Sequence, residues 1–287
     1  MDQLHNPQHS QTNEGASLRF VYFGTPSVAS ETLATLLARG FKPTLAVTSP
    51  DAPAGRGLAL TPSPVRMLAK KHGIPAIMPE TLDDAAVAEI RSKGAEYAVV
   101  VAYGKIFSES LVRAFPKGVL NVHYSLLPKY RGATPLEAAL LAGEAETGVT
   151  IQKMAKELDA GDIVAQRSTL IGLTETAKEL RPRLIALGAE LLVETLPVFE
   201  RGEITPIPQP IASPTLHARK LKKEDGLISL DAPAKENWNK YRAYADSIGT
   251  YFFMDGKRIK ITAATFSNGK FIIQRVIPEG KHEMAYR

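Results

Sequence analysis

Three polar residues, Asn121, His123 and Asp159, have types and spacing that suit chemistry on a carbonyl group. The run Gly118–His123 is predicted to form a strand, and because side chains alternate along a strand, Asn121 and His123 share one face. Asp159 follows a second strand-like run, Val149–Met154, in an Asp-Ala-Gly turn that could direct its carboxylate at the imidazole. Such a carboxylate would orient His123 and favour its protonated form.

This set of side chains predicts acyl transfer to a free amine, in which a nitrogen adds to a carbonyl and the developing oxyanion needs hydrogen-bond donors. Asn121 and His123 would supply those donors. We expect no covalent nucleophile, because the chain has no Cys and Ser125 is too near His123 in sequence to form an ordinary relay. The six His show no paired ligand spacing, so we expect no metal site.

The same residues lie in motifs that resemble the folate-dependent formyltransferases. Those motifs are Asn121-Val-His, Ser125-Leu-Leu-Pro with Arg131-Gly132, Glu146-Thr-Gly-Val-Thr, and Leu158-Asp159-x-Gly161. A further stretch, Ser49-Pro-Asp-Ala-Pro-Ala-Gly-Arg-Gly followed by Thr61-Pro-Ser-Pro-Val, is similar to a loop of the methionyl-tRNA formyltransferases that relatives acting on small substrates lack. The resemblance covers about Leu18 to Met284, with gaps in the last quarter.

By this resemblance, the chain would move a formyl group from 10-formyltetrahydrofolate to the methionine amine of initiator methionyl-tRNA. Asn121 and His123 would hold the oxyanion, and Asp159 would orient the imidazole. Arg56 would contact the acceptor stem of the tRNA. The residues that would flank the folate, whose pterin is held largely by backbone groups, are Tyr103, Gly104, Ile106, Ser125, Leu126, Leu127 and Pro128. Of these, Ile106, Leu126 and Leu127 could equally belong to a plain apolar core.

Two other functions stay open at this point. One is formylation of an amino-sugar nucleotide, against which the loop around Arg56 and the basic C-terminal quarter count. The other is a non-catalytic tRNA- or folate-binding protein, for which the intact Asn-His-Asp set is the main difficulty. Tyr124 stands where the family usually has Gly, and it could narrow the acceptor site.

The net charge of +5 is concentrated in the last quarter of the chain. Residues 216–287 carry 14 Lys and Arg against 8 Asp and Glu, whereas residues 1–215 are close to neutral. A basic domain beside a neutral catalytic one suits an enzyme with a polyanionic substrate. The candidate phosphate contacts are Arg219, Lys220, Lys222 and Lys223, for which a solvated basic face is the alternative.

Strand-like and helical patterns alternate from Leu18 to Glu200, which predicts an α/β fold with a doubly wound, mostly parallel sheet. A single Gly in the first strand-helix turn, Gly24-Thr-Pro, makes dinucleotide binding improbable. The last quarter has strand-like runs separated by Asp255-Gly256 and Asn268-Gly269, so we expect a small antiparallel β domain. By resemblance that domain would be barrel-like and shortened relative to the family.

The expected organisation has four parts. They are a disordered tail at 1–17, a catalytic domain at 18–201, a Pro-rich linker at 202–215 and a basic, tRNA-binding β domain at 216–287. No apolar run reaches membrane-spanning length, and the polar tail lacks the features of a secretory or transit signal. We therefore expect a cytoplasmic monomer.

Overall fold

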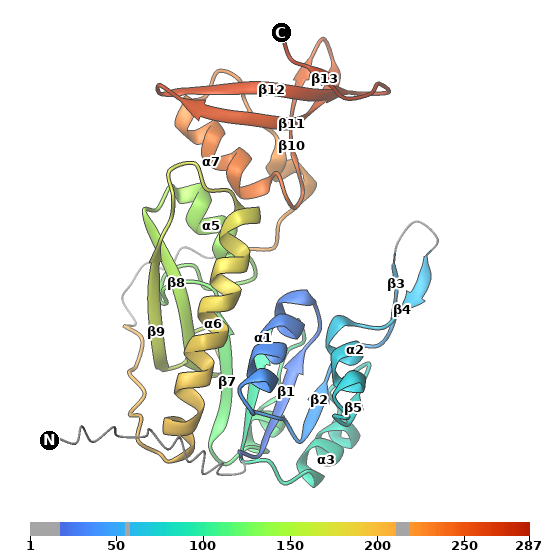
Figure 1. The fold of residues 1–287 in the computed structure, drawn as a ribbon, viewed down its shortest axis with the longest axis vertical. Helices are drawn as coiled ribbons and strands as arrows, with labels where there is room; N and C mark the ends of the chain where they lie inside the picture. Colours follow the sequence, from blue (N-terminus) through green and yellow to red (C-terminus); the bar gives the residue numbers. More distant parts are fainter. Residues whose placement is uncertain (1–17, 55–57, 211–217) are drawn as a thin grey trace, which may run out of the picture.

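Alternating strands and helices build a seven-stranded sheet in the larger part of the molecule (Figure 1). The structure, a computed structural model, describes residues 18–54, 58–210 and 218–287. The strand order is β5-β2-β1-β6-β7-β8-β9; the first five run parallel, and β8 and β9 are antiparallel. The strands are β1 (Phe20–Gly24), β2 (Leu45–Val47), β5 (Ala76–Ile77), β6 (Tyr97–Val101), β7 (Gly118–His123), β8 (Glu146–Lys153) and β9 (Ile163–Leu170). The predicted doubly wound, mostly parallel sheet is confirmed.

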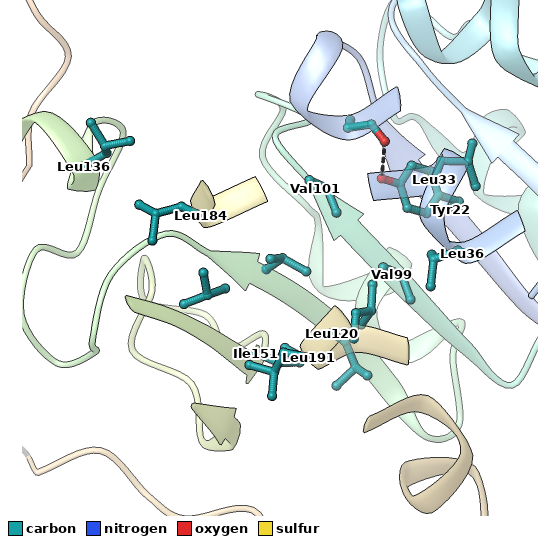
Figure 2. Packing of buried hydrophobic residues seen from close by; sticks show 14 of the residues in the cluster. Tyr22, Leu33, Leu36, Val99, Val101, Leu120, Leu136, Ile151, Leu184 and Leu191 are labelled. Carbon is teal, nitrogen blue, oxygen red and sulfur yellow. Dashed lines mark hydrogen bonds between the residues drawn. The ribbon is translucent and has the colours of Figure 1, made fainter. Parts of the chain in front are cut away.

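Helices cover both faces of this sheet. The helices are α1 (Ser27–Ala38), α2 (Pro64–Lys71), α3 (Asp84–Ser92), α4 (Glu109–Arg113), α5 (Pro135–Ala142) and α6 (Ala177–Glu200). Figure 2 shows Leu36 of α1 and Leu191 of α6 near Val99 and Leu120 of the central strands, and Leu184 of α6 beside Leu136. The opposite face carries α3 and α4, which form a second apolar core. Side-chain alternation therefore divides each central strand between two cores, as expected for parallel strands buried on both faces.

The C-terminal part is an antiparallel sheet with one helix against it (Figure 1). Its elements are α7 (Ala234–Tyr244), β10 (Thr250–Met254), β11 (Lys257–Ser267), β12 (Lys270–Pro278) and β13 (Met284–Ala285), with the 3₁₀ turn η1 (Lys223–Gly226) before them. The predicted two-residue turns join β10 to β11 and β11 to β12, and both residues of each turn have positive φ, which Asp, Asn and Gly adopt most readily. Trp238 and Tyr241 of α7 pack against this sheet through Phe252, Ile259 and Ile261.

The two parts are joined by contacts of α7 with α5 and with the loop after β9. The Trp238 indole N–H donates to Leu173 O at 3.2 Å, and the buried Arg242 guanidinium donates to Gly172 O at 3.3 Å and Leu140 O at 3.5 Å. A third small sheet, the hairpin of β3 (Ala52–Ala54) and β4 (Ala59–Thr61), projects from the part that holds the seven-stranded sheet (Figure 1). Within residues 18–54, 58–210 and 218–287, none of the helices has the length and apolar character needed to cross a bilayer.

Candidate active site

His123 and Asp159 lie together beside the carboxyl end of β7. The His123 Nδ1 atom is 3.7 Å from Oδ2 of Asp159, and both side chains are largely buried. His123 ends β7, whereas Asp159 lies in the turn between β8 and β9. The antiparallel pairing of β7 with β8 thus brings together two residues that are far apart in sequence.

Asp159 is held in its turn by hydrogen bonds to both carboxylate oxygens. Oδ1 accepts from Nε2 of Gln152 at 2.8 Å, and Oδ2 accepts from the backbone N–H of Gly132 at 2.8 Å. The Asp159 backbone has a φ of 49°, in the left-handed region that Asp tolerates better than most residues. Gly161 completes the turn, because a Cβ there would lie 1.7 Å from Lys153 O. The predicted Asp-Ala-Gly turn therefore exists and directs the carboxylate toward His123.

The second ring nitrogen of His123 also has a partner. Nε2 lies 2.9 Å from Tyr130 O, and because a carbonyl only accepts, this nitrogen carries the proton. Burial lowers the pKa of His123 below its ordinary value, although Asp159 and the Tyr130 carbonyl act in the opposite direction. Asp159 thus favours the protonated ring as expected, but burial outweighs it.

Asn121 lies two residues before His123 on the same face of β7. In register it sits between Val100 of β6 and Gln152 of β8. Asn121 is only half-buried, and its amide forms no hydrogen bond with any residue in the part of the chain that the structure describes. No described residue thus occupies its N–H donors, which fits the predicted role.

The loop after β7 is fixed by a buried hydroxyl of β8. Thr150 Oγ1 donates to Ser125 O at 2.6 Å and accepts from the Leu127 backbone N–H at 3.1 Å. Gln166 of β9 adds bonds to Thr150 Oγ1 at 2.8 Å and to Leu127 O at 3.0 Å. Ser125 and Leu127 are buried, and Leu126 and Pro128 are partly exposed. The predicted donor-binding residues of this loop thus form a rigid wall next to His123.

The second predicted donor segment follows β6. The Tyr103 ring is buried against Phe23 and Phe107, and burial raises the pKa of its hydroxyl to about 12. Gly104 is exposed with a φ of 79°, and a Cβ there would meet open space; Ile106 is 94% exposed. The plain-core alternative therefore fits the buried Leu127, fits the partly exposed Leu126 only in part, and is wrong for Ile106. An open backbone beside an exposed apolar side chain fits a flat heterocycle held by main-chain groups.

The residues assigned to tRNA have different environments. Arg56 lies outside the described residues. Arg219 forms a two-pronged ion pair with Asp225, which raises the pKa of the guanidinium and lowers that of the carboxyl. Lys220, Lys222 and Lys223 are exposed on the segment around η1. The three Lys are therefore better placed for phosphate contact than Arg219, whose charge is already balanced.

Tyr124 faces away from His123, as the next residue along the chain should. Its ring lies near Gly188 of α6 and Thr32 of α1, on the far side of the sheet, where burial raises the pKa of the hydroxyl to about 12. It lines the apolar core between two helices. The expectation that Tyr124 narrows the acceptor site does not fit this position.

Sequence reasoning missed the polar side chains that support Asp159. Gln152 carried a usable signal, since it is a polar residue on the same face of its predicted strand as Thr150. Gln209 carried none, because it sits between two prolines in a segment predicted to be a linker. No group of three His, Asp or Glu among residues 18–54, 58–210 and 218–287 is arranged to hold a metal ion.

Two family models match the chain. The model of the formyl transferases matches residues 18–196, and that of the formyl transferase C-terminal domain matches residues 220–285. A methionyl-tRNA formyltransferase of Citrifermentans bemidjiense is 42% identical over 253 residues, which cover 88% of this chain and 79% of the relative. That of Bdellovibrio bacteriovorus is also 42% identical, over 87% of this chain and 79% of the relative.

Solved structures share the fold. A methionyl-tRNA formyltransferase from Clostridium thermocellum superposes with a TM-score of 0.62 at 16% identity, covering 91% of this chain and 98% of that one. An N-formyltransferase from Helicobacter canadensis, in complex with folinic acid and dTDP-3-aminofucose, gives a TM-score of 0.68 at 19% identity, covering 88% of each chain. From the family matches and the 42% identity, the chain belongs to the methionyl-tRNA formyltransferase family of the formyl transferases.

Proposed function

We propose that this protein transfers the formyl group of 10-formyltetrahydrofolate to the methionine amine of initiator methionyl-tRNA. The observation that carries this function is the buried His123–Asp159 pair beside the free amide of Asn121, in a chain of this family. The donor supplies a formyl group on nitrogen. A carbon–nitrogen bond to the methionine amine forms, the bond to the folate nitrogen breaks, and the proton lost by the amine ends on the folate nitrogen.

Asn121 and His123 stabilise the oxygen that becomes negative during transfer. The Asn121 amide already has free donors. His123 Nε2–H exchanges its present acceptor, Tyr130 O, for the developing oxyanion. A hydrogen bond to a neutral carbonyl contributes a net of about 1 kcal/mol, and a charge-assisted one is roughly twice as strong. The exchange is therefore favourable only when charge develops, which stabilises the transition state selectively.

His123 and Asp159 together bind and release one proton during the transfer. Nδ1 of the ring faces the carboxylate, so a proton on Nδ1 is held between the two groups. The hydrogen bonds from Gln152 and Gly132 keep the carboxylate in place for this role. Asp159 then stabilises the imidazolium, whose formation burial alone would oppose. The pair can accept the proton of the attacking amine and return it to the leaving nitrogen.

The substrates are assigned to two sides of this centre. We place the folate donor against the loops Tyr103–Ile106 and Ser125–Pro128, and the tRNA against Arg56 and the three exposed Lys around η1. The corresponding division is a catalytic domain at 18–201, a linker at 202–215 and a basic domain at 216–287. We also propose that the protein acts as a cytoplasmic monomer, because Asn121, His123 and Asp159 lie together without a contribution from a second chain.

An assay with two acceptors tests this function. Purified protein and 10-formyltetrahydrofolate are offered initiator methionyl-tRNA and, in a parallel reaction, an amino-sugar nucleotide. We expect formylated methionyl-tRNA and no formylated sugar. Product from the sugar alone would support the amino-sugar function, and binding of tRNA or folate without any product would support the non-catalytic alternative.

A further inference from the structure

Gln209 lies in the segment that leads from the catalytic part to the C-terminal part, yet its side chain is only 7% exposed. The backbone before it is anchored to the edge of the large sheet, because Ile207 and Ile163 exchange two hydrogen bonds of 2.8 Å. Prolines on both sides, Pro208 and Pro210, restrict its backbone further. The buried Gln209 side chain thus has a fixed position.

The Gln209 amide bridges two loops of the candidate site. Its Nε2 donates to Asp159 O at 2.9 Å and to Gly161 O at 2.7 Å. Its Oε1 accepts from Nε and from one terminal nitrogen of Arg131, at 3.1 and 2.7 Å. A guanidinium only donates and a carbonyl only accepts, so the chemistry of the partners leaves one orientation for this amide. Both the nitrogen and the oxygen of the Gln209 amide therefore have two hydrogen-bond partners.

These contacts complete the support of Asp159. Gln152 and Gly132 hold the two carboxylate oxygens, and Gln209 holds the main-chain carbonyl of the same residue. The turn needs this support, because Asp159 has a left-handed backbone conformation that is less favourable than the extended or helical ones. We propose that Gln209 is a positioning residue that sets the distance between the Asp159 carboxylate and His123.

This role rests on the proposed function, because it acts through the His123–Asp159 pair. Without the Gln209 amide, two carbonyls and the Arg131 guanidinium lose their partner in a largely buried place, so the turn should shift to recover hydrogen bonds. A shift of about 1 Å in a catalytic group can cost roughly 10²-fold in rate. Binding of folate and tRNA should change little, since Gln209 forms no hydrogen bond with those of the assigned residues that the structure describes.

The test compares Gln209→Met with Gln209→Glu and with a control. Methionine keeps the length and much of the volume of glutamine but has no donor. Glutamate keeps an acceptor for Arg131 and has no proton to donate until it is protonated. Ile207→Ala is the matched control, because Ile207 belongs to the same segment but is 67% exposed and contacts Asp159 through no hydrogen bond among the described residues. Thermal unfolding of each variant checks that it is folded.

The first readout is steady-state kinetics. We expect kcat of Gln209→Met to fall by about 10- to 100-fold while KM for both substrates stays within about 2-fold, and Ile207→Ala to match the wild type. The ratio of kcat of Gln209→Glu to that of Gln209→Met should rise as the pH falls, because the introduced carboxyl group regains one donor when it is protonated. If Gln209→Met does not fold, the rise in kcat of Gln209→Glu relative to wild type at low pH carries the same test.

The second readout needs no activity. NMR titration of the imidazole gives the pKa of His123, which the facing carboxylate raises. Displacement of Asp159 should lower this pKa in Gln209→Met and leave it unchanged in Ile207→Ala. An unchanged His123 pKa with wild-type kcat would overturn the positioning role. If the wild-type protein formylates nothing but the His123 pKa is still lower in Gln209→Met than in wild type, the proposed function is overturned and the positioning of Asp159 stands.

Discussion

His123 shows how burial and a neighbouring charge compete at one residue. The sequence predicts the three site residues, because their types and the period of a strand place Asn121 and His123 on one face. It does not predict the net protonation of His123, since that depends on how deeply the ring is buried and on the Tyr130 carbonyl at its second nitrogen. It also misses Gln209, whose polar contacts depend on tertiary packing rather than on local pattern.

The lowered pKa of His123 gives a pH dependence of stability. Between the folded pKa and the ordinary value of 6.5, the unfolded chain binds more protons than the folded one, so stability rises with pH through this window and is fully present above it. Wild type should therefore lose stability relative to His123→Gln as the pH falls from about 7.5 to 5.5, by at most about 1.4 kcal/mol per pH unit. Urea unfolding of both proteins across this range measures the difference. A constant difference would contradict the assigned burial effect.

At the scale of elements, strong apolar patterns in the sequence were sufficient to predict a strand or helix, whereas weak patterns were not. The apolar strand β7 was predicted with the bounds Gly118–His123 that the structure gives it. The edge strand β9 was missed because its alternation includes exposed polar residues, and α7 was missed because only one stripe of a largely polar sequence faces the sheet. Both elements owe their place to packing against neighbours rather than to local propensity.

Strand β8 offers a test of how the loop after β7 is held. Thr150→Val removes a buried hydroxyl that bonds Ser125 O, the Leu127 N–H and Gln166. Leaving these partners unpaired should cost about 2–4 kcal/mol of stability and raise KM for the folate donor several-fold. Denaturant unfolding and steady-state kinetics measure the two effects.

Thr147→Val is the matched control on the same strand. Thr147 is 2% exposed, and its hydroxyl has no hydrogen-bond partner within the described parts of the chain. Replacing an unpaired buried hydroxyl by a methyl group should be neutral or slightly stabilising. Equal destabilisation by both variants would mean that volume and shape, rather than the hydrogen bonds of Thr150, hold the loop.

At the scale of the whole molecule, the catalytic part and the C-terminal part differ in both fold and charge. The catalytic part is nearly neutral, whereas the C-terminal part holds the positive excess. The contacts of α7 with α5 and the loop after β9 connect the two, so the tRNA that we propose for the C-terminal part would be held in a fixed relation to His123. The sequence predicted this charge split but not which cations are free, because the Arg219–Asp225 pair forms only in the fold.

The exposed Lys around η1 should contribute to tRNA affinity through phosphates. Lys222→Glu/Lys223→Glu should weaken tRNA binding and reduce the slope of log K against log salt by about 1 for each lost contact. The control is Lys42→Glu/Arg91→Glu, which makes the same charge change on exposed residues of the catalytic part. Titration of tRNA at several salt concentrations measures both. Identical slopes for the two double variants would mean that net charge alone acts.

Single-turnover formylation of initiator methionyl-tRNA tests most directly whether Asn121, His123 and Asp159 perform the transfer. The rate of the chemical step is measured with saturating enzyme and 10-formyltetrahydrofolate for wild type, Asn121→Ala, His123→Ala and Asp159→Asn. Each variant should be slower by roughly 10²-fold or more, the effect of losing an oxyanion donor or its support, while remaining folded. A His123→Ala protein that formylates methionyl-tRNA at close to the wild-type rate would contradict the account.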